Sequence, residues 1–341
     1  MAQAAQGSRD EGIMDRRTLL VRGLAATAFT GLSSVPVCRA WGQPATYAAF
    51  LAGVRHEALG QGLPAGVIDQ ALALCKTPNA AVIKADRHQP EQVLTWAQYK
   101  DRVLTEKKLS DGLQAMTEQG ERIGQIGGQY RVSRGVIAGI WGLESAYGTR
   151  MGKFSVIDAL ATLAFEGRRA AFFRGELFKA LHILAQGGME PRAMLGSYAG
   201  AMGQPQFMPS AYERFAVSYP EGGRPDIWRN EADVFASIAN YLARSGWQDG
   251  AIWGEAVTVP DSMAQAQLGR SHVRPLSWWV QQGVRPRAGR FADNAAMGAV
   301  IRPDGAGGEA FVVYHNFNVI RRYNASDFYA LAVGILGDAI T

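Results

Sequence analysis

The residue in the most unusual setting is a glutamate near the end of a predicted helix. Three apolar residues of this segment share one face of a helix with about 3.6 residues per turn: Ile137, Ile140 and Trp141. Glu144 continues that face. An ionised carboxylate there costs several kcal/mol unless it is paired, so burial raises the pKa from about 4.3 toward about 6 or higher. A carboxylic acid that keeps its proton near neutral pH is a general acid.

A glutamate at a helix end more often bends out to water, and that alternative stays open for Glu144. Three features favour the buried acid. The predicted helix stops at Gly148, so the carboxylate lies near a terminus where a cleft can form. Ser145 and Tyr147 add polar and aromatic groups beside it. A glycine-rich aromatic segment follows about fifty residues later, at residues 197–210.

That second segment has the composition of a ligand-contacting loop. Its small residues let the backbone approach a ligand closely. Ser197 and Gln206 can form hydrogen bonds with hydroxyl or acetamido groups. Three further side chains offer an apolar wall: Met202, Phe207 and Met208. An ordinary turn with a methionine-rich packing patch is equally compatible with these residues.

Helices must position both segments, because the pattern is mainly helical up to about residue 245. Capping residues and glycines predict helices that begin near or just after the following positions: Tyr47, Pro64, Ser110, Ser133, Ser155, Ala170, Asn230 and Ser326. The helix that carries Glu144 is expected over Val136–Tyr147. Short strands are expected at Val257–Pro260, Ala299–Ile301 and Phe311–Tyr314, with a short helix at Pro275–Gln282 between them.

Composition excludes several classes of protein. The chain has 341 residues, of which 48% are apolar and 19% charged, as in a globular protein. A net charge of +5 without a run of Lys or Arg gives no nucleic-acid patch. The 2 cysteines cannot form a disulfide framework, and the 5 histidines have no metal-ligand spacing. We therefore expect no metal and no cofactor.

The first forty residues are typical of an export signal. Arg16 and Arg17 precede a weakly apolar stretch from Leu24 to Leu32, and small residues follow up to Ala40. This layout predicts a twin-arginine signal, cleavage after Ala40 and a periplasmic protein. A disordered basic tail is the alternative. A lipid anchor at Cys38 is disfavoured because Pro36 and Val37, rather than small residues, stand directly before this cysteine.

Two blocks together resemble the membrane-bound lytic transglycosylase B family of murein-cleaving enzymes. They are Glu144–Gly148 (ESAYG) and Gly200–Ser210 (GAMGQPQFMPS), and the pair is more specific than either block alone. Met151–Lys153, Asp158–Leu163 and Arg321–Asn324 are also similar to that family. The resemblance covers roughly residues 44–340.

The resemblance implies a mainly α (α+β) fold, with a lysozyme-like helical core, an additional helical region and a small mixed α/β lobe. The expected division of the chain is a signal peptide at residues 1–40, a helical region at 41–130, the catalytic core at 131–249, the small lobe at 250–320 and a C-terminal helix at 321–341. Some members carry an Asp-rich calcium loop after the second block. Here residues 218–226 supply too few oxygen ligands for calcium, which prefers about six to eight.

The resemblance further implies cleavage of the β-1,4 bond between N-acetylmuramic acid and N-acetylglucosamine in peptidoglycan, leaving a 1,6-anhydromuramoyl end. Glu144 matches the catalytic acid/base. Six residues match groups that contact the glycan, the last two with a weaker correspondence: Ser197, Gln206, Tyr241, Asn324, Tyr99 and Tyr323. Glycan strands are thus the expected partner and cell-wall synthesis proteins further candidates, while nothing requires more than a monomer.

Glycosidases usually need two carboxylates, and neither block supplies a second one. Asp158 is expected in a helix cap and Glu166 among arginines. A single acid/base suffices if the substrate's own C6 hydroxyl is the nucleophile. A hydrolytic muramidase and a non-catalytic murein-binding scaffold are the alternatives.

Overall fold

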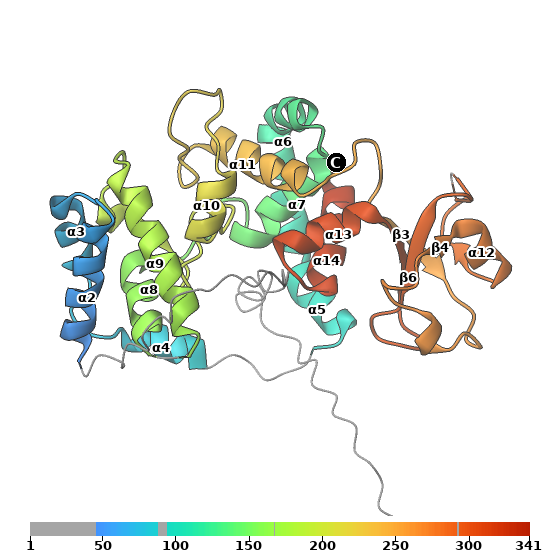
Figure 1. Ribbon diagram of the computed structural model, residues 1–341. Coiled ribbons are helices and arrows are strands. Elements are labelled where there is room, and N and C mark those ends of the chain that lie inside the picture. The colour runs from blue at the N-terminus through green and yellow to red at the C-terminus, as the bar shows by residue number, and fades with distance from the viewer. Residues whose placement is uncertain (1–45, 88–93, 167, 292) are drawn as a thin grey trace, which may run out of the picture.

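The computed structural model describes residues 46–87, 94–166, 168–291 and 293–341, and it is mainly helical with a small sheet, as predicted (Figure 1). The predicted export signal and its cleavage site lie outside the described residues. Within the described part of the chain, no helix combines the length and apolar character needed to cross a membrane.

Most of the described residues lie in helices that Figure 1 labels where space allows. These are α2 (Tyr47–Gly60), α3 (Ala65–Leu72), α4 (Ala80–Arg87), α5 (Trp96–Val103), α6 (Glu106–Tyr130), α7 (Arg134–Ser145), α8 (Val156–Phe165), α9 (Ala170–Ala185), α10 (Pro209–Phe215), α11 (Glu231–Arg244), α12 (Leu276–Gln281), α13 (His315–Tyr323) and α14 (Asp327–Ile340). The strands are β1 (Phe154–Ser155), β2 (Leu195–Gly196), β3 (Gly254–Thr258), β4 (Arg274–Pro275), β5 (Arg285–Pro286), β6 (Met297–Ile301) and β7 (Ala310–Val313).

Helices α7 and α14 pack closely through glycines at the centre of the molecule (Figure 1). A Cβ added to Gly139 would lie 2.5 Å from the backbone oxygen of Val333, and one added to Gly337 would lie 2.5 Å from that of Gly135. These pairs run in opposite directions along the two helices, so the helices are antiparallel. The end of α7, with Glu144, therefore lies beside the start of α14.

The larger sheet has the antiparallel order β4-β6-β7-β3-β5 and is buried on both faces at its centre. Along β7, Phe311 and Val313 join the large helical core, whereas Ala310 and Val312 join a second core. This alternation follows from the two-residue period of a strand. The second core includes Trp279 of α12, so residues 254–313 have a hydrophobic centre of their own. The name small lobe is kept for the predicted range, residues 250–320, which contains this second core.

Two predicted helix boundaries are wrong. Helix α6 begins at Glu106, because the Thr105 hydroxyl accepts a hydrogen bond from the Lys108 amide at 3.2 Å. Ser110 therefore lies inside the helix, and Leu113 just after it is 54% exposed. Helix α7 ends at Ser145 rather than at Tyr147, because residues 146 and 147 have φ values of 49° and 57°.

The other predicted elements are present with ends shifted by a few residues. The hydroxyls of Ser155 and Ser326 cap α8 and α14, and the Asn230 side chain caps α11. The three predicted strands correspond to β3, β6 and β7. Several short elements were not predicted from the sequence, among them α4, α5, α10 and α13.

Candidate active site

Glu144 is the penultimate residue of α7 and is half-buried, with its Oε1 atom shielded from solvent. The residues one and two turns earlier on the same face form the predicted apolar stripe. Ile137 and Ile140 are fully buried and Trp141 is 3% exposed. The helix therefore presents the carboxyl group at the edge of the core rather than free in water.

Three hydrogen bonds fix the end of α7. The Ser145 hydroxyl, which is fully buried, donates to the Trp141 carbonyl at 3.2 Å and accepts from the Gly148 amide at 3.0 Å. Lys108 Nζ donates to the Gly142 carbonyl at 2.7 Å. A cation at a helix C-terminus also compensates the negative end of the helix dipole. The Ser145 hydroxyl and the Lys108 side chain thus both fix the backbone that carries Glu144.

Gln204 is a further supporting residue, and the sequence analysis missed it. Its Oε1 accepts a hydrogen bond from the Trp141 indole at 2.6 Å, and its Nε2 donates to the Trp228 carbonyl at 3.1 Å. A Cβ on Gly148 would lie only 2.7 Å from the same Oε1. The available signal was the indole N–H of Trp141, because a buried tryptophan usually has a hydrogen-bond partner.

The glycine-rich loop is buried along its whole length from Gly196 to Pro209. Met202 and Phe207 exchange two backbone hydrogen bonds of 2.7 and 3.1 Å, which close the loop on itself. Met202, Phe207 and Met208 are at most 5% exposed and belong to the large hydrophobic core. Of the two interpretations left open by the sequence, packing in the core therefore describes these three side chains.

The side chains of Ser197 and Gln206 both form hydrogen bonds with nearby backbone groups. The Ser197 hydroxyl accepts from the Ala201 amide at 3.0 Å. Gln206 has a φ of 51°, and its Nε2 donates to the carbonyls of Met151 at 3.0 Å and Gly203 at 2.8 Å. The bond to Met151 joins the glycine-rich loop to the segment that follows α7.

Tyr241 and Tyr323 pack against each other, with ring centroids 4.7 Å apart. Phe207 of the glycine-rich loop contacts both rings. The Tyr323 hydroxyl donates to the Pro205 carbonyl at 2.7 Å, and the Tyr241 hydroxyl donates to the Arg322 carbonyl. This aromatic group therefore joins α11 and α13 to the glycine-rich loop.

The pKa of Tyr323 connects this aromatic group to Glu144. Burial raises the pKa of Tyr323 well above 10, and the nearby negative charge of Glu144 raises it further. Burial also raises the pKa of Tyr241 to about 12, although the cations Arg214 and Arg322 act in the opposite direction. Glu144 and Tyr323 are thus electrostatic neighbours despite lying on different helices.

Asn324 and Tyr99 lie near the start of α14. Asn324 is 2% exposed, and its Oδ1 accepts from the Ser326 amide at 3.2 Å. The Tyr99 ring lies 5.7 Å from that of Phe328 in the first turn of α14. Because α14 starts beside the end of α7, both residues lie on the side of the molecule where α7 ends. Tyr99 thereby contacts the first turn of the helix that follows Asn324.

Both carboxylates that the sequence analysis set aside are engaged elsewhere. Asp158 accepts a hydrogen bond from Asn79 Nδ2 at 2.7 Å, and Glu166 forms an ion pair with Arg87 at 2.6 Å. Glu166 and Arg87 also line a cavity of about 220 Å³ between α4 and α8. The predicted site residues do not line this cavity, so we do not assign the chemistry to it.

The segment corresponding to a calcium loop is tied to the protein by Asp226 and by Asp233 of α11. Asp233 accepts from the amides of Tyr219 and Asp226, both at 2.7 Å. Asp226 in turn accepts from the amides of Trp228 and Arg229, both at 3.0 Å. Among the described residues, no three Asp, Glu, His or Cys side chains gather as a metal site would require. That this protein needs no metal stays a prediction.

Comparisons with known proteins agree with the resemblance. The profile of the family described as "Transglycosylase SLT domain" matches residues 46–338. The membrane-bound lytic murein transglycosylase B of Escherichia coli K12 is 33% identical over 252 residues, which are 72% of this chain and 67% of that protein.

Solved structures show the same fold. SltB3 of Pseudomonas aeruginosa, solved with NAG-NAM-pentapeptide and with NAG-anhNAM-pentapeptide, is 37% identical with a TM-score of 0.83 over 87% of this chain and 80% of that one. The Escherichia coli lytic transglycosylase Slt35, solved in complex with calcium, is 28% identical with a TM-score of 0.72, and the match covers 85% of this chain and 92% of that one.

Proposed function

The chain belongs to the transglycosylase SLT domain family and is a lytic transglycosylase of peptidoglycan, and we propose that Glu144 is its single catalytic acid and base. The observation that carries the proposal is the position of Glu144. Its carboxyl group lies at the end of a buried helix, with Oε1 shielded and the aromatic pair of Tyr241 and Tyr323 nearby. Partial burial favours the protonated form of a carboxyl group, which is the form a general acid needs.

The proposed reaction needs one proton donor and no water. Glu144 protonates the glycosidic oxygen as the bond from C1 of the muramoyl ring to that oxygen breaks. The 2-acetamido group of the same ring stabilises the cationic centre. Glu144, now a carboxylate, removes the proton from the C6 hydroxyl, whose oxygen bonds to C1 and closes the 1,6-anhydro ring. The proton returns to Glu144, so the acid is regenerated. The anhydro ligand bound by SltB3 supports this product for the family.

We assign the surrounding polar residues to glycan binding. Ser197, Gln206 and Asn324 supply hydroxyl and amide groups, and Tyr241, Tyr323 and Tyr99 supply aromatic and phenol groups. The hydrogen bonds of Ser197 and Gln206 to the backbone support a second role, because they also hold the loop behind the substrate in one conformation.

One experiment tests the chemistry directly. Purified murein sacculi are digested with the enzyme, the products are separated, and their masses are measured by mass spectrometry. Glycan ends 18 Da lighter than hydrated reducing ends indicate the anhydro product, whereas hydrated ends would establish a hydrolytic muramidase. Glu144→Gln should fold with an unchanged circular dichroism spectrum and lose nearly all turnover. If the wild-type protein binds sacculi but releases no soluble products, it is a murein-binding scaffold instead.

We further propose that residues 1–40 direct export to the periplasm, where the enzyme acts as a monomer without metal or cofactor. The Arg16-Arg17 pair supports this route, and the residues before Cys38 support a mature protein without a lipid anchor. Replacing both arginines by lysine should retain the precursor in the cytoplasm. Mass measurement of the exported protein should give an N-terminus at Trp41, and a lipid-modified Cys38 would contradict the proposal.

The domain division remains part of the proposal. Residues 131–249 with 321–341 would form the catalytic core, residues 41–130 a helical region and residues 250–320 the small lobe. The two hydrophobic cores support a separate lobe, since residues between Val257 and Val312 form the second of them. We also propose that cell-wall synthesis proteins contact this enzyme, which crosslinking would test.

A further inference from the structure

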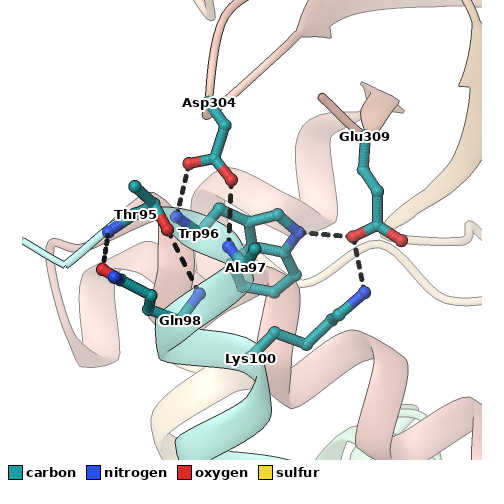
Figure 2. A network of polar contacts seen from close by, with 7 residues as sticks. All are labelled: Thr95, Trp96, Ala97, Gln98, Lys100, Asp304 and Glu309. Atoms are coloured by element: carbon teal, nitrogen blue, oxygen red, sulfur yellow. Dashed lines mark hydrogen bonds and ion pairs between the residues drawn. The ribbon is translucent and has the colours of Figure 1, made fainter. Parts of the chain in front are cut away.

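We infer that Asp304 and Glu309 of the small lobe are positioning residues that hold α5, and with it Tyr99, against the glycan-binding side of the protein. The inference rests on the proposed function, because it takes Tyr99 as a glycan contact. It assigns a task to the small lobe, whose residues the catalytic mechanism does not otherwise use. Both carboxylates lie in the connection between β6 and β7, and Figure 2 shows both of them directed at α5.

Asp304 completes the N-terminus of α5 (Figure 2). Its Oδ1 accepts from the Trp96 amide at 2.5 Å and its Oδ2 from the Ala97 amide at 2.9 Å. The next amide, that of Gln98, is bound by the Thr95 hydroxyl at 3.2 Å. The first turn of a helix leaves its amides without partners inside the helix, and a negative charge there is favourable. The small lobe thus supplies acceptors for the first two amides of α5, and the helix's own cap at Thr95 serves the third.

The short length of α5 makes that external cap important. The helix has 8 residues, and isolated helices shorter than about 12–15 residues are marginal in water. Contacts from the rest of the protein must therefore define where α5 lies. Asp304 is separated from Trp96 by 208 positions in the chain, so its two bonds fix α5 relative to the small lobe rather than only within itself.

Glu309 fixes the rotation of α5 about its axis. Its Oε2 accepts from the Trp96 indole at 2.7 Å and from Lys100 Nζ at 2.9 Å (Figure 2). Trp96 and Lys100 are four residues apart and so lie on one face of the helix. Trp96 is fully buried, and the carboxylate is the acceptor for its indole N–H. Rotation of α5 about its axis would therefore break the bond from Trp96 to Glu309 or the bond from Lys100 to Glu309.

The rotation of α5 sets the position of Tyr99. Tyr99 lies three residues after Trp96, and the two rings are stacked with centroids 6.2 Å apart. Both rings also contact Phe328 at the start of α14, at 5.6 Å for Trp96 and 5.7 Å for Tyr99. Because α14 starts beside the end of α7, the small lobe controls how Tyr99 is presented on the side of the protein that carries Glu144.

The test measures kcat and KM on soluble glycan strands for Asp304→Asn and Glu309→Gln. Both variants should raise KM by about three- to tenfold with kcat nearly unchanged. Asp249→Asn is the matched control, because Asp249 forms a 2.9 Å ion pair with Arg131 that has no part in holding α5. The control should leave KM unchanged. Melting temperatures recorded for every variant separate a loss of stability from a loss of binding.

A double-mutant cycle separates positioning of Tyr99 from a general loss of structure. If the two carboxylates act through Tyr99, neither substitution should raise KM further in a Tyr99→Ala background. The same rise in that background, or an unchanged KM in the single variants, would overturn the inference. If Asp304→Asn does not fold, Glu309→Gln carries the test alone, since its amide can still accept from the indole but has no charge to pair with Lys100. Retained turnover by Glu144→Gln would instead refute the proposed function.

Discussion

The indole nitrogen of Trp141 and the side-chain oxygen of Gln204 are joined by a buried hydrogen bond of 2.6 Å. Trp141 lies one turn before Glu144 on α7, and Gln204 lies within the glycine-rich loop. The bond therefore connects the helix that carries the proposed catalytic acid to the loop that carries Gln206. Gln204 also binds the backbone at Ile227 and Trp228, so it joins three separate segments.

Gln204→Ala should lower kcat by about tenfold or more, because small displacements of a catalytic group have large effects on rate. It should also destabilise the protein by about 1–3 kcal/mol, since the indole N–H is left buried without an acceptor. Steady-state kinetics and thermal unfolding measure the two effects.

The control for this variant is Gln114→Ala, which removes an exposed glutamine that binds Glu118 on α6. It should change neither kcat nor stability measurably. A Gln204→Ala protein with reduced stability but normal kcat would show that Gln204 braces the fold without positioning Glu144.

Gly139→Ala should destabilise the protein by about 1–3 kcal/mol, as overpacking does elsewhere. The added Cβ would lie 2.5 Å from the Val333 carbonyl, and backbone atoms cannot easily move away. Gly175→Ala in α9 is the matched control, because nothing lies within 4 Å of its Cβ position. The control should be neutral or stabilising by up to about 1 kcal/mol, since alanine favours helix over glycine. Equal effects of both substitutions on chemical denaturation would contradict the close packing of α7 against α14.

Glu309 should make the stability of the protein depend on pH. Burial alone would raise its pKa, but the bonds from Lys100 and Trp96 outweigh burial and lower the pKa below its ordinary value of 4.5. A carboxyl group with a lowered folded-state pKa stabilises the protein above its unfolded pKa and loses that contribution as the pH falls through the folded value. The stability difference between wild type and Glu309→Gln should therefore be constant near neutral pH and shrink below about pH 4.5. Urea unfolding at several pH values measures it, and a difference that grows toward acid pH would contradict the assignment.

Glu176 should show the opposite dependence. Burial raises the pKa of this carboxyl group, although it accepts a 2.9 Å hydrogen bond from the Ser210 amide. The ionised form is therefore disfavoured in the folded protein, and stability falls as the pH rises through the unfolded pKa. Glu176→Gln keeps an acceptor for the amide and should raise stability at pH 7 but not below about pH 4. The same urea series tests it, and a variant less stable than wild type at pH 7 would show that the charge itself is favourable.

The placement of Glu144 could be predicted because it depends on helical periodicity alone. Ile137, Ile140 and Trp141 recur at that period, and the structure buries all three. The supports of the site could not be predicted in the same way. Gln204 meets Trp141 across 63 positions and Asp304 meets Trp96 across 208, and no local pattern records such distant pairs.

The start of α6 was predicted wrongly because the local capping signals are ambiguous. Thr105 and Ser110 are both good caps, and only the packing of the folded chain decides between them. The apolar residues of the glycine-rich loop were equally ambiguous, because a methionine or phenylalanine can line a cleft or fill a core. Their burial in the folded protein resolves that choice.

Tyr323→Phe tests whether the phenol beside Glu144 takes part in proton transfer. Burial and the charge of Glu144 keep the Tyr323 pKa well above 10, so this hydroxyl stays protonated throughout the range in which the enzyme is measured. The variant loses the hydrogen bond to Pro205 and should lower kcat, because the loop next to Glu144 is less firmly held. The pH at which kcat falls on the alkaline side should not move, since the proposed reaction gives this phenol no proton to transfer. A shift of that pH by about one unit or more would mean that Tyr323 titrates with the reaction, and Glu144 would then not be its only proton-transferring group.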